Sequence, residues 1–199
     1  NASALGQDSI ASNTNTTATG QSATASGVNA TANGQDSLAN NSNTSALGQL
    51  AQATGTNASS VGQNANASGS NSSALGQNSV ASNVNTTATG QAATASGTNA
   101  TADGQDSLAN NSNTSALGQS AQATGVNASA LGQSSVASNL NTTTTGQAAR
   151  FMIPPAVLEE RLVRVAQIVG VQVGLAATDA QQFGELERGA AGDALERVA

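Results

Sequence analysis

The sequence predicts an all-β parallel β-solenoid, or β-roll, of 14-residue coils over residues 1–149, followed by a small, mainly helical segment over residues 150–199. Three observations lead to this: a strict 14-residue period, the small side chains that fill it, and an abrupt change of composition at Arg150. A unit of this length is too short for two helices and a turn, so each unit is expected to form one coil of a solenoid.

The period does not slip anywhere in the repeat region. Counted from Asn1, the first position of every 14-residue row is Asn, and the sixth and seventh positions are Gly-Gln, from Gly6-Gln7 to Gly146-Gln147. Each row also divides into halves of seven, because Ala at the fourth position is matched at the eleventh, and Gly at the sixth by Gly or Asn at the thirteenth. Each coil should therefore contain two short strands and two tight turns, with Gly and Asn supplying positive φ where the halves join.

The composition sets what can lie inside a coil. Hydrophobic residues make up 37% of the chain, but most are Ala, and aromatic residues account for 1%. Ala or Ser at the fourth, ninth and eleventh positions can form only a thin layer between two sheets. At about 25 cal/mol per Å² of apolar surface, Ala burial contributes little per residue, so hydrogen bonds between coils and a further buried face must contribute much of the stability.

Composition also excludes several functions. The chain has no Cys, His or Lys, no paired carboxylates at a recognisable spacing and no phosphate-binding loop before a helix, so we expect no enzyme, cofactor or metal site. The net charge of −6 and the absence of Arg from residues 1–149 argue against a nucleic-acid partner. No apolar run could span a bilayer, so this segment should not insert into a membrane. Because the chain opens in register, we expect that further sequence once preceded it.

Alternation along the strands places two apolar stripes on the outside of the coils. If the fourth position faces inward, the third and fifth face outward, and the third is always Ser or Thr. The fifth position is apolar in most rows and is interrupted by Thr19, Asn33, Thr89 and Asp103. Its apolar members are Leu5, Leu47, Val61, Leu75, Leu117 and Leu131. The tenth position carries a second, more broken stripe of Ile10, Leu38, Val80, Leu108 and Val136. An exposed stripe on a narrow solenoid requires a partner.

The row N-x-S-A-L-G-Q-x-A-x-A-T-G resembles the YadA-like head repeat of trimeric autotransporter adhesins, whose signature is S-V-A-I-G followed by x-x-A-x-A-x-G. The resemblance covers residues 1–149. It implies a left-handed parallel β-roll in a homotrimer. Ser45, Ala46, Leu47 and Gly48 stand where V-A-I-G stands, with Ser or Thr replacing the Val throughout. The threefold axis would then be lined by Leu5, Leu47, Val61, Leu75, Asp103, Leu117 and Leu131.

The same resemblance implies a non-enzymatic adhesin head displayed outside the cell at the outer membrane. Such a head would attach to host, matrix or other surfaces through an extended ligand, or act as a rigid spacer in a trimeric fibre. Two alternatives stay open. One is the shaft of a phage or injection-machine fibre. The other is an ice-binding solenoid, suggested by pairs such as Thr17 and Thr19, although other residues intervene between the paired rows.

The turn columns are interpreted as ladders of stacked amides at about 4.8 Å, the spacing between strands. The columns begin with Asn1, Asn15, Asn29 and Asn43 on one side and with Gly6, Gln7, Gly20, Gln21, Gly48 and Gln49 on the other. Each first-position Asn also opens an Asn-x-Ser/Thr triplet, so glycosylation is the alternative. Asp8, Asp36 and Asp106 are expected to be solvent-facing turn residues without a calcium array. Three copies of Asp103 on an axis would be hydrated or neutralised by a cation.

The last fifty residues have a different character. All five Arg of the chain lie here, and Pro154-Pro155 would end the solenoid and open a helix. Leu158, Leu162, Val165 and Val169 share the apolar face of that helix. We expect this segment to act as a cap that promotes trimerisation.

Overall fold

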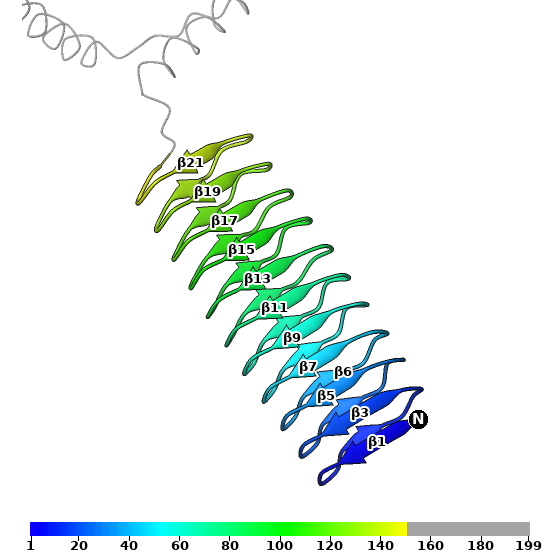
Figure 1. Ribbon diagram of the computed structural model, residues 1–199. Helices are drawn as coiled ribbons and strands as arrows, with labels where there is room; N and C mark the ends of the chain where they lie inside the picture. Colours follow the sequence, from blue (N-terminus) through cyan, green and yellow to red (C-terminus); the bar gives the residue numbers. More distant parts are fainter. Residues whose placement is uncertain (151–199) are drawn as a thin grey trace, which may run out of the picture. The chain divides into compact units, whose positions relative to one another are not determined.

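The computed structural model describes residues 1–150, which form a parallel β-solenoid of two sheets with one coil per 14-residue row (Figure 1). The first sheet contains β1 (Ala2–Leu5), β3 (Thr16–Thr19), β5 (Thr31–Asn33), β7 (Ser45–Leu47), β9 (Ser59–Val61), β11 (Ser73–Leu75), β13 (Thr87–Thr89), β15 (Thr101–Asp103), β17 (Ser115–Leu117), β19 (Ser129–Leu131) and β21 (Thr143–Thr145). The second contains β2 (Ile10–Ala11), β4 (Thr24–Ala25), β6 (Leu38–Ala39), β8 (Gln52–Ala53), β10 (Asn66–Ala67), β12 (Val80–Ala81), β14 (Thr94–Ala95), β16 (Leu108–Ala109), β18 (Gln122–Ala123) and β20 (Val136–Ala137). The described residues contain no helix, so the predicted fold class is confirmed for them.

The pairing register equals the sequence period. Ser73 lies between Ser59 and Thr87, so every residue stacks on its equivalents in the coils before and after. Backbone hydrogen bonds run in both directions between coils. Gly76 N–H donates to the carbonyl of Val61 at 2.8 Å, and Val80 N–H donates to the carbonyl of Ala93 at 2.8 Å. These bonds satisfy the strand groups of each inner coil on two sides.

The core is a thin layer of Ala, as predicted for the fourth, ninth and eleventh positions. Ala74 and Ala81, from the two sheets of one coil, have no exposed surface, and the same is true of their equivalents in neighbouring coils. The second position also faces inward, which the sequence analysis did not assign. Thr86 is fully buried there, and its hydroxyl donates a hydrogen bond to the carbonyl of Asn83 at 2.7 Å. A buried hydroxyl with its own partner avoids the penalty of an unsatisfied group.

The residue type at the second position of a row is correlated with that of the residue three places earlier, at the thirteenth position of the preceding row. When that residue is Asn, the second position is Thr, and when it is Gly, the second position is Ala or Ser. The Asn amide also reaches forward, as when Asn41 Nδ2 donates to the carbonyl of Thr54 at 2.8 Å. A Cβ added at Gly69 would lie 1.8 Å from the carbonyl oxygen of Asn83. The chain thus uses two versions of this turn, one with an Asn and Thr pair and one with Gly.

Positive φ occurs at three positions of the row, only one of which was predicted. Gly at the sixth position has φ between 111° and 141°, as expected. The thirteenth position was also expected to have positive φ, and this is wrong, because Gly there relieves packing against the next coil instead. The left-handed residues are the first and eighth positions, with φ of 54° to 59° from Asp8 to Ala148. Asn at the first position suits this conformation, since its short polar side chain tolerates it best among non-Gly residues.

Replacing the stacked Gly76 by Ala should destabilise the solenoid by about 2 to 4 kcal/mol. The new Cβ would lie 2.5 Å from the carbonyl oxygen of Gly90, at a φ of 139° that side chains rarely adopt. Gly146→Ala is the matched control, because it has a similar φ of 111° but no atom of residues 1–150 within 4 Å of the added Cβ. Urea unfolding, monitored by circular dichroism, should give a much lower free energy of unfolding for Gly76→Ala than for Gly146→Ala. Equal losses would show that φ alone fixes these glycines.

Replacing Leu50 by Asn should stabilise the chain by about 1 kcal/mol. Leu50 has a φ of 59° in the eighth position, and its side chain is 41% exposed, so little packing is lost. Val84→Asn is the control, since Val84 is 42% exposed but is not among the residues with positive φ. Thermal unfolding should show a higher melting temperature for Leu50→Asn and no increase for Val84→Asn. A gain in both would assign the effect to exposed apolar surface rather than to backbone strain.

Candidate functional surfaces

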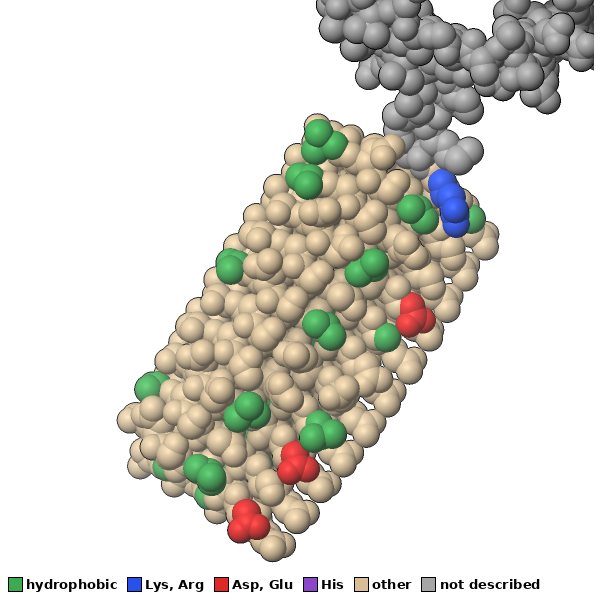
Figure 2. Space-filling view, turned by 180° about the vertical axis from the view of Figure 1, so that it is seen from behind, with side chains coloured by type: hydrophobic (Ala, Val, Ile, Leu, Met, Phe, Trp, Pro, Cys, Tyr) green, Lys and Arg blue, Asp and Glu red, His purple; other side chains and the backbone are tan. Residues whose placement is uncertain are grey.

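The outer face of the first sheet carries the fifth-position stripe. Leu47, Val61, Leu75 and Leu117 are 36% to 39% exposed although they lie within the array, and Leu5 on the first coil is 71% exposed. Their register places them in one column, since Leu47 pairs with Val61 and Val61 with Leu75. Figure 2 shows hydrophobic side chains as separate groups on a surface that is mostly uncharged and polar. The structure therefore leaves part of a column of Leu and Val side chains open to solvent.

Polar residues interrupt the same column. Asn33 lies between Thr19 and Leu47, and Asp103 lies between Thr89 and Leu117. The side chain of Asp103 is exposed in the single chain. The column thus consists of apolar stretches separated by two polar ones, about half the array apart.

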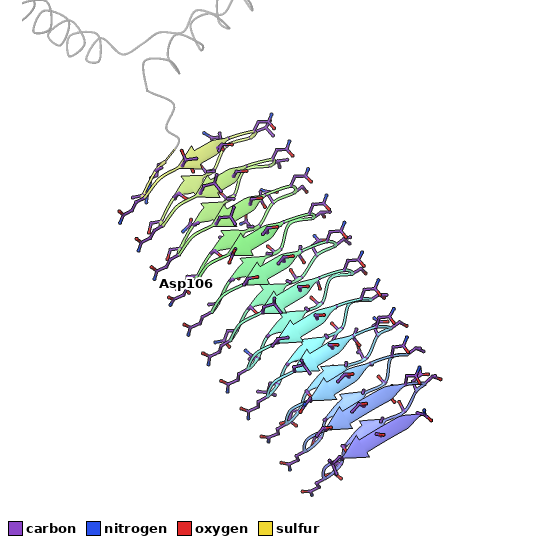
Figure 3. The ribbon with its side chains drawn as sticks, in the orientation of Figure 1. Asp106 is labelled. Atoms are coloured by element: carbon purple, nitrogen blue, oxygen red, sulfur yellow. The ribbon has the colours of Figure 1, made fainter. Side chains whose placement is uncertain are left out.

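One turn edge carries a continuous ladder of Asn amides (Figure 3). Asn15 Nδ2 donates to Asn29 Oδ1 at 3.1 Å, and the same bond repeats along the column until Asn127 donates to Asn141 at 2.9 Å. These side chains are exposed, so each amide keeps further donor and acceptor capacity toward solvent.

The other turn edge carries a ladder of Gln amides that runs in the opposite direction. Gln49 Nε2 donates back to Gln35 Oε1 at 3.2 Å, and Gln63 donates to Gln49 at 3.1 Å. Equivalent bonds extend this run to Gln91, and a second run joins Gln105 to Gln147, but no such bond joins Gln91 to Gln105. Gln7 and Gln21 contribute backbone carbonyls, which accept the N–H groups of Ser22 and Asp36 at 2.9 Å. The turn glycines Gly6, Gly20 and Gly48 let successive backbones stack this closely.

Charge is scarce on the described surface. Asp8, Asp36 and Asp106 lie exposed at the eighth position, and Arg150 is the one basic side chain in residues 1–150. This part of the chain contains no group of three or more His, Cys, Asp or Glu residues that could hold a metal ion. Within it there is also no helix long and apolar enough to cross a membrane.

The fourteenth position forms a further apolar column that the sequence analysis did not single out. Val28, Val84 and Val126 are 38% to 42% exposed, and Leu140 is 64% exposed. Ser or Thr occupies this position in the other rows, which hid the column in the sequence. It lies beside the Asn ladder, because the fourteenth position directly precedes the first.

The tail residues Leu158, Leu162, Val165 and Val169 lie outside the described residues, as do the other features expected for residues 151–199.

Comparison with known proteins defines an adhesin-type head. The family model "YadA head domain repeat (2 copies)" matches residues 1–23, 18–40, 25–51, 39–65, 53–79, 67–92, 81–107, 109–135 and 123–147. The chain therefore belongs to the YadA head repeat family. Among solved structures it is similar to the collagen-binding domain of the Yersinia adhesin YadA, with 25% identity, a TM-score of 0.47, and coverage of 81% of this chain and 87% of that one. A comparison with curated proteins gave no match.

Substitutions in the two ladders can separate the contribution of backbone conformation to stability from that of the side-chain amide bonds. Asn71→Ala removes two amide hydrogen bonds and places Ala at a φ of 56°, so we expect a loss of about 2 kcal/mol. Gln77→Ala also removes two amide bonds, but not at a left-handed residue, so we expect at most about 1 kcal/mol. Asn71→Gly, which removes the amide but relaxes φ, should fall between them in urea unfolding. If Asn71→Gly is as unstable as Asn71→Ala, the amide bonds rather than the backbone fix the column.

Proposed function

We propose that the chain is the head of a homotrimeric surface adhesin, which attaches to an extended surface or matrix ligand and catalyses no reaction. Membership of the YadA head repeat family supports an adhesin-type head displayed outside the cell. The observation that carries the proposal is the partly exposed fifth-position column on the first sheet. Three such columns that meet on a threefold axis would cover one another.

Burying the fifth-position column between subunits favours their association. Fully burying a Leu or Val side chain stabilises a protein by about 1.5 to 3 kcal/mol, and the apolar members of the column other than Leu5 are already more than half buried. Their remaining exposed surface therefore contributes less per residue, but it recurs in several coils of each subunit. Ser and Thr at the third position, such as Ser73 and Thr87, are small enough to let the sheets of neighbouring subunits approach closely.

The axis leaves other surfaces free for a ligand. In this assembly the first sheet is covered, and the second sheet and both amide ladders point away from the axis. These surfaces carry few charges and repeat from coil to coil, so they suit a ligand that is itself extended rather than a small molecule held in one pocket. Binding then depends on many weak contacts made at once.

Two alternatives are less well supported. A flat ice-binding array would need Thr pairs in neighbouring coils, but Thr19 pairs with Leu5 on one side and Asn33 on the other. A fibre shaft would share the trimeric rod but need no ligand, and family membership favours the adhesin head over it.

The double substitution Leu75→Asp with Leu117→Asp should dissociate the trimer or prevent folding, because unpaired carboxylates would crowd on a partly dry axis. Val84→Asp with Val126→Asp is the matched control, since both valines are similarly exposed but lie on the fourteenth-position column. Light scattering should report a trimer for the parent and the control and a smaller species for the axis variant. A monomeric parent, or an axis variant that remains a trimer, would refute the axis.

Binding to immobilised matrix polymers, collagen among them, tests the adhesive part of the proposal. The folded trimer should bind at least one of them, and the dissociated axis variant should bind far more weakly because it has lost multivalency. A folded trimer that binds none of a broad panel would favour the spacer or shaft function.

A further inference from the structure

Asn33 is the only Asn of the chain that is followed by Gly. The side-chain amide of Asn is chemically labile, because the backbone nitrogen of the next residue can attack its Cγ. Gly as the next residue leaves that nitrogen unhindered, since it has no Cβ. Asn33 lies at the end of β5, and its side chain is exposed to water. Asn33 is therefore the amide of the array with the least hindered neighbouring nitrogen.

A second coil shows the array with an acid in place of this amide. Residues 29–42 and residues 99–112 have the same sequence except that Asp103 replaces Asn33. Asp103 is likewise exposed, at the end of β15. Both coils pair in the same register with the coils before and after them. A carboxylate at this position is therefore compatible with the coil.

Coil pairing holds the peptide unit that joins Asn33 to Gly34. The N–H of Gly34 donates to the carbonyl of Thr19, in the coil before, at 2.8 Å. The carbonyl of Asn33 accepts the N–H of Gly48, in the coil after, at 2.8 Å. Side chains of a strand stand roughly perpendicular to the sheet, whereas these bonds lie within it. While both bonds persist, the nitrogen of Gly34 is directed away from Cγ of Asn33.

We propose that Asn33 is a site of spontaneous deamidation, which coil pairing blocks and which reacts only in chains whose coils are open. Once the bonds to Thr19 and Gly48 are lost, the nitrogen of Gly34 forms a bond to Cγ of Asn33. The proton of that nitrogen leaves with the side-chain NH₂ group as ammonia, and a cyclic imide remains. Water opens the imide at either carbonyl, which gives aspartate or isoaspartate. Water is the only co-reactant, and the reaction takes place within one chain, so it does not depend on the proposed trimer.

The two products differ in their effect on the array. Either one adds a negative charge to the fifth-position column. Aspartate leaves the main chain unchanged and gives residues 29–42 the sequence of residues 99–112. Isoaspartate runs the main chain through the former side chain and lengthens it by one carbon atom, so the register between neighbouring coils cannot be kept there. A chain that stays unpaired for long therefore loses its register at one defined residue.

Ageing of the full chain in mildly alkaline buffer, with and without urea, tests the site. Peptide mapping by mass spectrometry should show that Asn33 is converted in urea before any other Asn. In the folded chain its conversion should be at least about tenfold slower, because local opening must come first. Asn33→Gln is the matched control, since it keeps an amide but its additional methylene disfavours ring closure. Conversion at residue 33 should be far slower in this variant in urea.

The products provide a second measurement. Asn33→Asp should fold with a melting temperature close to that of the parent, as the coil of Asp103 indicates. Chains aged in urea should then be returned to buffer and treated with elastase, which cuts after small residues and digests unpaired coils. The resistant, refolded fraction should contain aspartate at residue 33, and isoaspartate should be found mainly in the digested fraction.

Three results would overturn the proposal. Equal rates with and without urea would show that coil pairing does not block the reaction. Earlier conversion of another Asn in urea would place the reactive amide elsewhere. An Asn33→Asp variant that fails to fold, or isoaspartate that is equally abundant in the resistant fraction, would show that the coil does not distinguish the two products.

Discussion

Parallel pairing at a fixed step of 14 residues is the constraint on which the rest of the structure depends. Since each residue stacks on its equivalents, any preference of a position is repeated along the whole array. The close approach of successive backbones is possible only where no Cβ intervenes, as at Gly76, where a Cβ would lie 2.5 Å from the carbonyl oxygen of Gly90. The Gly-Gln column and the backbone hydrogen bonds are therefore two consequences of one register.

The same register explains how a core without large side chains can be stable. Ala74 and Ala81 are completely buried, but each contributes little apolar area, so the backbone ladder and the buried hydroxyls contribute more of the stability than in a globular protein. Thr86 and Ser79 each donate to a carbonyl three residues earlier in the chain. Their partners are local, so these two hydroxyls are satisfied without a network that spans coils.

The sequence was sufficient to predict the coil, its two strands and its inward Ala positions, because the period of 14 and the alternation of side chains depend on the chain alone. The prediction for the thirteenth position was wrong, since Gly27 and Asn41 both suggest positive φ. Gly27 is required for a different reason, because a Cβ there would lie 1.8 Å from the carbonyl oxygen of Asn41. The buried role of Thr86 was also missed, because its partner at Asn83 becomes visible only when the turn is built. The amide ladders could be anticipated from their columns, but not the opposite directions of their hydrogen bonds.

Some positions of the row are the same in every coil and stabilise the fold, whereas others vary and shape the outer surface. The first, sixth, seventh and eleventh positions are constant in the described rows, and they supply turns, ladders and core. The fifth, eighth, tenth and fourteenth positions vary, and all of them face outward, as at Leu50 and its equivalent Ser120. A coil can therefore change what it presents without changing how it stacks. For a head that binds through many coils at once, one outward substitution should alter affinity slightly, whereas one substitution in a constant column disturbs the coils on either side and with them the whole repeated surface.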